Sequence, residues 1–254
     1  MNSQHARVAF RDRAVVDVLD LALRFLVVQA RPYAKVGLVV LVPSLAVVLA
    51  AGKLLGWPAA WGIALPVALL AEIPFTVLAS RLVFEDRVRA RDVLVAAAVA
   101  LPRLALARFV SIAAIAVALC LLVVPGVWLA ASLLFLGEVL LLERGPRTIS
   151  RTERLASHGL DGVLLALITL ALLPVLAVLF ADIAGRGLLG ELFEIRPPLP
   201  IWRSYGGVLP ALGLLAQVPF RATTRFFCYL NVRTRVEGWD IQNRFVRIAT
   251  APDR

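Results

Sequence analysis

The sequence predicts an all-α fold, a polytopic bundle of six transmembrane helices with cytoplasmic amphipathic helices before spans one, three and five. The first reason is composition: the 254 residues are 61% hydrophobic and 17% charged, whereas soluble domains are about 45–50% apolar and about 25% charged. The mean hydropathy is +0.86. The second reason is that the apolar residues form runs of roughly 20, enough to cross about 30 Å of hydrocarbon. The third is that basic residues gather in alternate connections between these runs, as cytoplasmic loops do.

Six segments are expected to span the membrane. They cover residues 34–55, 59–84, 104–124, 127–142, 162–183 and 205–230. Pro125 and Gly126 predict a tight corner between the third and the fourth, and the fourth is short for a full crossing. The chain is thereby divided into three parts: a cytoplasmic or interfacial amphipathic helix over residues 1–33, a six-span domain over 34–230, and a cytoplasmic C-terminal segment over 231–254.

The basic residues predict the orientation. If the N-terminus is cytoplasmic, four basic residues face outward, namely Lys53, Arg186, Arg196 and Arg203. Nearly all the others lie on the inner side, which predicts that both termini are cytoplasmic. The same asymmetry accounts for the net charge of +10 without a nucleic-acid partner. The outer loop over residues 185–204 is rich in Gly and Pro, and Trp202 and Tyr205 are expected to anchor it at the interface.

Three segments on the cytoplasmic side look alike. Before the first span, charged side chains recur at intervals of four, three and four residues, on one stripe of a helix; they are Arg13, Asp17, Asp20 and Arg24. The same spacing precedes the fifth span, at Arg147, Arg151, Arg154 and His158. Before the third span, residues 91–103 form a short apolar segment that suits an interfacial or re-entrant helix. These segments are either ordinary connecting helices or a basic collar for anionic headgroups or an acidic partner.

Four ionisable residues are expected inside the spans, namely Glu72, Glu138, Arg221 and Arg225. At helical rise, the first acid and the first arginine lie ~13 Å from the inner boundary, and the second acid and arginine lie ~7–8 Å from it. The matched depths predict the pairs Glu72–Arg221 and Glu138–Arg225, because an unpaired charge in hydrocarbon costs at least a few kcal/mol. Three interpretations stay open: ion pairs that lock helices together, arginines that reach the interface beside protonated or hydrated glutamates, and a proton- or ion-coupling role.

Two stretches resemble the motifs of a bacterial family. They are residues 125–159, PGVWLAASLLFLGEVLLLERGPRTISRTERLASHG, and residues 229–240, YLNVRTRVEGWD. The family is the multi-span membrane domain associated with some glycerophosphodiester phosphodiesterases. The matching positions are Pro125, Gly126, Glu143, Arg151, Leu155, Gly159, Arg233, Arg235, Glu237, Gly238 and Asp240, and the departures are Arg144, Thr152 and Asn231. The resemblance implies a stand-alone membrane domain in the bacterial cytoplasmic (inner) membrane. It does not imply phosphodiesterase activity, because the sequence contains no phosphodiesterase catalytic domain.

The second of these motifs predicts that the sixth helix continues into the cytoplasm. An acidic residue of the motif would pair there with an arginine of the helix before the fifth span. The residues of this expected cytoplasmic lock are Arg151, Arg154, Arg233, Arg235, Glu237 and Asp240. The alternative is a solvated, basic segment where the chain leaves the membrane.

The function classes follow from what the sequence offers. It has no Ser/His/Asp set, metal-ligand spacing or phosphate loop, and its only histidines are His5 and His158. We therefore expect a protein without catalytic activity, cofactor or metal, which scaffolds or regulates a membrane partner or binds anionic lipid at the inner leaflet. Its expected partners are membrane lipids, a membrane protein or a second copy of itself. The alternative is a small transporter or permease subunit that uses the intramembrane Glu and Arg charges. A lipid-modifying enzyme has no acid–base pair or metal pattern in its support.

Overall fold

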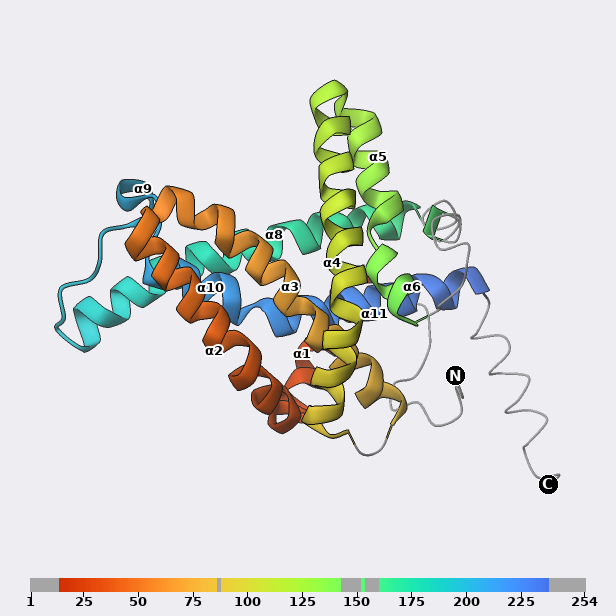
Figure 1. Cartoon of the computed structure of the whole chain (residues 1–254), viewed down its shortest axis with the longest axis horizontal. Coiled ribbons are helices and arrows are strands. Elements are labelled where there is room, and N and C mark those ends of the chain that lie inside the picture. The colour runs from red at the N-terminus through yellow and green to blue at the C-terminus, as the bar shows by residue number, and fades with distance from the viewer. Residues whose placement is uncertain (1–13, 86–87, 143–151, 154–159, 238–254) are drawn as a thin grey trace.

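The computed structural model describes residues 14–85, 88–142, 152–153 and 160–237 (Figure 1). All regular elements in this part of the chain are helices. Five helical segments within it are long and apolar enough to cross a membrane: Ala30–Leu55, Trp57–Phe84, Ala90–Leu121, Val123–Leu142 and Gly162–Leu192. The expected all-helical, multi-pass class is confirmed, whereas the expected sixth span is not among these five segments.

Helix α1 (Val15–Val28) packs against the rest of the protein with one face. Its buried residues recur every three or four positions and are Val15, Val18, Ala22 and Phe25. Phe25 meets Phe227 of α11 (Val218–Glu237) edge to face, with ring centroids 5.2 Å apart. On the exposed side, Arg24 Nε lies 2.9 Å from Oδ2 of Asp20. Two members of the charged stripe expected before the first span therefore pair, while Arg13 lies outside the described residues.

Helix α3 (Trp57–Phe84) is the central helix of the fold. It forms an antiparallel hairpin with α2 (Ala30–Leu55), and Gly56 alone joins the two (Figure 1). Gly56 has a φ of 83°, a left-handed value that glycine adopts without a steric penalty. Helix α3 also contacts α4, α10 and α11, and every residue from 71 to 80 is buried. Any charge on this stretch must therefore find its partner inside the protein.

Helix α4 (Ala90–Leu121) corrects the expected boundary of the third span. Residues 91–103, expected as a separate interfacial segment, form the first turns of this single helix. The segment is rich in alanine, the strongest helix former. Pro102 removes one backbone donor without ending the helix. Helix α6 (Leu136–Leu142) packs against α4.

Helix α5 (Val123–Leu133) folds back along α4 (Figure 1). The corner lies at Leu122, which is extended with φ −154° and ψ 132°, and not at Pro125 and Gly126 as expected. Pro125 instead stands in the first turn of α5, where a helix leaves its N–H groups without intrahelical partners. Gly126 faces α4, since a Cβ at this position would lie 2.8 Å from Cα of Leu119. The motif therefore sets the close approach of the two helices rather than the turn.

The expected sixth span, residues 205–230, is not a single helix. Helix α9 (Ile201–Ser204) ends at Tyr205, whose φ is 57°, and two glycines separate it from α10 (Val208–Ala216). Gln217 interrupts the path once more before α11 begins. Helix α11 carries four arginines, which makes it too polar to count among the apolar spans.

Helices α8 (Leu160–Gly187) and α10 pack together very closely. The π-helix Leu188–Leu192 extends α8 without a break. At Gly213 of α10, a Cβ would collide with the carbonyl oxygen of Ala177 and would lie 2.6 Å from Cβ of Ala181. Small residues let membrane helices approach backbone to backbone, and Gly213 has this role here.

The end of α2, the start of α3 and the short helix α9 lie together at one end of the molecule (Figure 1). Trp61 Nε1, near the start of α3, donates a hydrogen bond of 2.8 Å to the carbonyl oxygen of Tyr205. Arg186 lies over the ring of Trp202, with Cζ 5.8 Å from the ring centroid. Lys53 lies in the last turn of α2, next to the start of α3. This end of the molecule therefore carries the aromatic side chains expected of a membrane interface.

Large apolar side chains cover the outside of the molecule. The end of the hairpin where α4 meets α5 projects away from the other helices (Figure 1). Leu54, Val99 and Val124 are 82%, 79% and 80% exposed. Soluble proteins rarely expose contiguous apolar patches larger than a few hundred Å². Lipid chains are the medium that such a surface requires.

Candidate functional site

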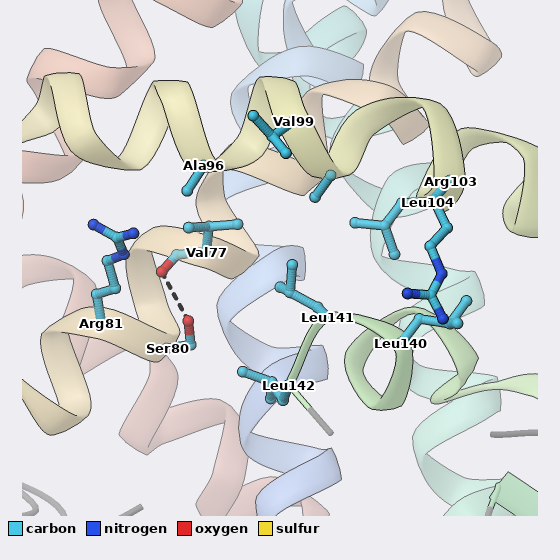
Figure 2. A pocket seen from close by; sticks show the side chains of 11 residues that line it. Val77, Ser80, Arg81, Ala96, Val99, Arg103, Leu104, Leu140, Leu141 and Leu142 are labelled. Carbon is cyan, nitrogen blue, oxygen red and sulfur yellow. Dashed lines mark hydrogen bonds between the residues drawn. The ribbon is translucent and has the colours of Figure 1, made fainter. Parts of the chain in front are cut away.

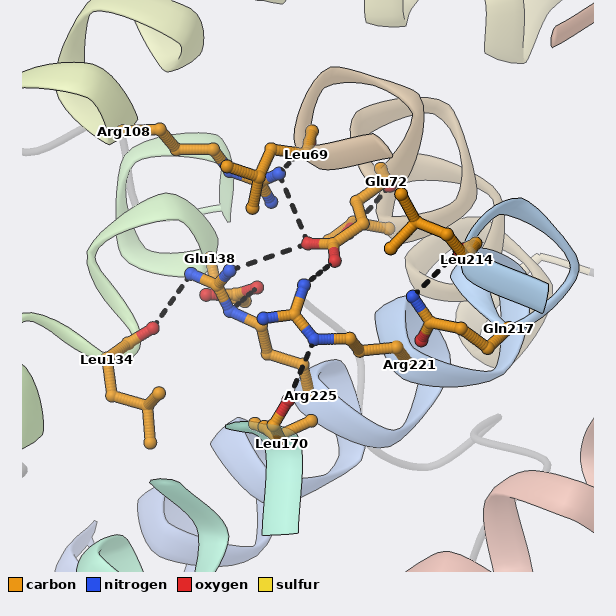
Figure 3. A network of polar contacts seen from close by, with 11 residues as sticks. Leu69, Glu72, Arg108, Leu134, Glu138, Leu170, Leu214, Gln217, Arg221 and Arg225 are labelled. Atoms are coloured by element: carbon orange, nitrogen blue, oxygen red, sulfur yellow. Dashed lines mark hydrogen bonds and ion pairs between the residues drawn. The ribbon is translucent and has the colours of Figure 1, made fainter. Parts of the chain in front are cut away.

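Glu72 is the centre of a buried cluster of charges (Figure 3). Its side chain, on α3, is 1% exposed. Arg221 of α11 pairs through Nη1 with Oε1 of this carboxylate. Arg108 of α4 and Arg225 of α11 place their Nη1 atoms 3.2 Å and 3.7 Å from its Oε2. The carboxylate of Glu72 therefore connects α3 with α4 and α11.

Glu138 is the second buried acid of the cluster. Its side chain, on α6, is 0% exposed, and Nε of Arg225 lies 2.9 Å from its Oε1. Arg221 and Arg225 are one helical turn apart and share a face of α11, so Arg225 lies between the two carboxylates. Breaking a buried ion pair from one side leaves an uncompensated charge, which costs about 3–5 kcal/mol. The four residues expected inside the spans are thus brought together in one network.

Each of the three arginines also donates a hydrogen bond to a backbone carbonyl oxygen (Figure 3). Arg108 donates to the carbonyl oxygen of Leu69. Arg221 Nε donates to that of Leu170 at 3.0 Å. In a regular helix this carbonyl would accept from the residue four positions later, which is Pro174 and has no N–H. The proline in α8 therefore supplies the acceptor that Arg221 uses.

The third carbonyl comes from a break in the fourth span. Residues 134 and 135 interrupt the helix between α5 and α6. Arg225 Nη2 donates to the carbonyl oxygen of Leu134 at 2.8 Å. A backbone carbonyl without a helical partner at membrane depth must find another donor. The guanidinium of Arg225 provides that partner.

Arg108 is the member of the cluster that sequence reasoning missed. It lies within the expected third span, but the positive-inside pattern groups it with the arginines of the inner face. Its side chain is 9% exposed and approaches Glu72. A signal was present, because an arginine more than one turn inside an apolar span requires a partner. With Arg108 included, three arginines face two glutamates, so the ionised cluster carries one excess positive charge.

The expected cytoplasmic lock falls largely outside the described residues. Arg151, Arg154 and Asp240 lie there, and Glu237 is described only as the last residue of α11. Arg233 Nη1 donates to the hydroxyl of Tyr229, one turn earlier, at 3.2 Å. The proposed pairing of the terminal motif with the helix before the fifth span stays a prediction.

A cavity of about 620 Å³ lies between α3, α4 and α6 (Figure 2). Among the described residues, two arginines line it, Arg81 from α3 and Arg103 from α4. Leu140, Leu141 and Leu142 of α6 form an apolar wall. We call this space, lined by the two arginines and the α6 leucines, the inner groove. Its lining combines cationic groups with hydrocarbon, as the site of an anionic amphiphile would.

No protein-family model matches the chain, and neither a curated protein nor a solved structure matches it. The resemblance to the bacterial multi-span membrane domain therefore stays a prediction from its motifs.

Proposed function

We propose that this chain is a multi-pass protein of the bacterial cytoplasmic membrane, without catalytic activity of its own, that binds an anionic lipid at the inner leaflet. In this proposal both termini are cytoplasmic, and the inner groove is the lipid site. The observation that carries the proposal is the lining of that groove, with Arg81 and Arg103 set among apolar side chains.

Electrostatics favours an anionic headgroup at this position. Arginine binds phosphate oxygens through charge-assisted hydrogen bonds and is enriched where phosphate is recognised. Arg81 lies in the last turn of α3, at the end that the charge pattern assigns to the cytoplasmic side. Arg103 is the last residue of the segment 91–103, which the sequence also assigns to the inner leaflet. The anionic lipids of that leaflet would meet both guanidinium groups.

The walls of the groove suit acyl chains. Val77 of α3, Val99 of α4 and the three leucines of α6 contribute apolar lining. A volume of about 620 Å³ lies within the range of about 300–1,000 Å³ that is typical of sites for small molecules. It therefore accommodates a headgroup and the first part of its chains, while the rest of each chain would extend into the bilayer.

Native mass spectrometry tests this proposal. The full chain is purified in a neutral maltoside detergent and titrated with phosphatidylglycerol or with phosphatidylcholine of identical chains. We expect phosphatidylglycerol to bind preferentially. The double variant Arg81→Gln/Arg103→Gln should lose this preference, because both guanidinium groups of the groove are then absent.

The matched control is Arg89→Gln/Arg91→Gln, which removes the same charge next to the start of α4, outside the groove lining. It should keep the preference for the anionic lipid. An equal loss in both double variants would contradict the groove and would favour a diffuse basic collar. Equal binding of the two lipids by the unaltered protein would contradict lipid selectivity itself.

A small transporter or permease subunit is the second candidate. The buried charge cluster favours it, since five ionisable side chains and a proline-freed carbonyl meet between the helices. Intramembrane ionisable groups at broken helices often mark ion or substrate pathways. Flux of protons or a test solute into liposomes that contain the protein, absent from liposomes without it, would support transport over lipid binding.

A further inference from the structure

A second cavity, of about 150 Å³, opens beside the charge cluster. We call it the cluster cavity. Its charged lining within the described part of the chain consists of the three cluster arginines, Arg108, Arg221 and Arg225, while neither Glu72 nor Glu138 lines it. Within the described residues, the three guanidinium groups thus border the cavity and the two carboxylates do not. An anion in this space would meet cationic groups without an intervening carboxylate.

The charge of the cluster leaves a place for one anion. Three guanidinium groups face two carboxylates, so one positive charge is unbalanced when all five groups are ionised. An unbalanced charge is costly where the surrounding medium is protein interior and lipid. One monovalent anion would make the cluster neutral.

Arg108 also has an unused donor at this place. Its side chain is 9% exposed, and its Nε is buried and donates no hydrogen bond to the described residues. Buried donors are normally satisfied, so each exception calls for a partner. The backbone carbonyl of Leu69 and the carboxylate of Glu72 occupy its Nη1. Nε of Arg108 therefore has donor capacity that no described residue uses, as does Nε of Arg225 in the same cluster.

Gly137 leaves the space that such a group needs. It lines the cluster cavity, and a Cβ at this position would lie 3.4 Å from Nη2 of Arg225 and 3.8 Å from Nε of Arg108. A side chain at Gly137 would therefore take up space directly beside both guanidinium groups. Ser111 also lines the cavity, but its hydroxyl donates to the carbonyl oxygen of Ala107 at 2.7 Å and does not add a donor for an anion.

We propose that the cluster cavity is a binding site for one oxyanionic group, a carboxylate or a phosphate, held by Arg108, Arg221 and Arg225. The rest of the lining is largely apolar and includes Ile112 and Ile115. Ile112 is also 44% exposed on the outer surface of α4, so the mouth of the cavity adjoins the lipid-facing side. The group can therefore be the head of an acidic amphiphile or a free anion.

This site is separate from the inner groove. The two cavities share no lining residue among those described, and Arg103 and Arg108 reach them from different turns of α4. Binding at the cluster cavity does not depend on the lipid function proposed above. The variant Arg81→Gln/Arg103→Gln should therefore leave it unchanged.

Direct binding measurements on the full chain in neutral maltoside test the proposal, with decanoate, decanol and inorganic phosphate as probes. We expect decanoate to bind at least about tenfold more tightly than decanol, because hydrogen bonds to a charged group contribute more than those to a neutral one. Binding of decanoate without phosphate would identify an acidic amphiphile, and comparable binding of phosphate would identify a free oxyanion. Absence of binding by both anions, or equal binding of decanoate and decanol, would overturn the proposal.

Two variants locate the site. Arg108→Gln should weaken anion binding by about tenfold or more, since it removes the excess charge and the unused donor. Gly137→Ala should also weaken anion binding, although alanine favours the helix more than glycine does. The matched control is Gly62→Ala, which meets open space around its Cβ and should bind the anion normally. If Arg108→Gln does not fold, Gly137→Ala decides. Unchanged anion affinity in a folded Arg108→Gln protein, or in Gly137→Ala, would overturn the assignment to this cavity.

Discussion

Arg225 Nε lies 2.9 Å from Oε1 of Glu138, whose side chain is completely buried. The two residues come from α11 and α6, so the pair connects the end of the fourth span to a helix that is too polar to be an apolar span itself. Because Arg225 also approaches Glu72, the loss of one side chain disturbs two carboxylates.

Replacing Arg225 should therefore be strongly destabilising. Arg225→Gln leaves Glu138 buried without its guanidinium, and we expect a loss of about 3–5 kcal/mol in the free energy of unfolding. Denaturant-induced unfolding in mixed micelles measures it. The control is Arg24→Gln, which removes an exposed pair with Asp20 and should cost about 0.5 kcal/mol or less. Similar losses in the two variants would show that the Glu138–Arg225 pair is not buried.

Replacing Arg108 should be much less harmful, although it is equally buried. Arg108→Gln leaves two guanidinium groups for two carboxylates, so the cluster becomes neutral. The variant loses the hydrogen bond to Leu69, and we expect a change within about 1 kcal/mol. The same unfolding measurement checks this value. A loss as large as that of Arg225→Gln would mean that Arg108 is required to compensate Glu72.

The close approach of α8 and α10 should not tolerate a side chain at Gly213. A Cβ would collide with the carbonyl oxygen of Ala177, and a backbone atom cannot move aside as a flexible side chain can. Gly213→Ala should destabilise the protein by about 1–3 kcal/mol. The control, Gly62→Ala, meets open space inside α3 and should be neutral or slightly stabilising. A stable Gly213→Ala protein would contradict the backbone contact between these helices.

Pro174 and Arg221 should be energetically coupled through the carbonyl of Leu170. Pro174→Ala restores an N–H that competes for this carbonyl, so the hydrogen bond from Arg221 Nε should weaken. Arg221→Lys has no Nε, and in that background Pro174→Ala should be neutral or stabilising. A double-mutant cycle on unfolding free energies should give a coupling of about 0.5–1.5 kcal/mol. Additive effects would show that Arg221 does not use the freed carbonyl.

The sequence predicted the contacts of the charge cluster better than the path of the helices. Hydrocarbon leaves a buried charge few options, so acids and bases at the same depth are expected to meet. Glu72 and Arg221 lie 149 positions apart in the chain and still pair. The sequence did not predict the contacts of Arg108. The positive-inside pattern indicates on which side of the membrane an arginine lies, but not which residues it contacts.

The breaks between helices were harder to foresee. Residues 134 and 135 interrupt the fourth span without a proline or glycine, and Gln217 separates α10 from α11. Tertiary contacts decide such positions, for instance the hydrogen bond from Arg225 to the carbonyl of Leu134. Conversely, Pro102 lies inside α4 without ending it. Local propensity therefore predicted that helices form here but not where each one ends.

A double-mutant cycle on Glu72 and Arg221 tests most directly whether a buried ion network holds α3 and α11 together. The unfolding free energies of Glu72→Gln, Arg221→Gln and the double variant are compared with that of the unaltered protein in the same micelles. Each single variant should be strongly destabilised, and the double variant should be at least about 1 kcal/mol more stable than the sum of the two losses predicts. Additivity within about 0.3–0.5 kcal/mol would show that the two side chains do not interact and would contradict the network.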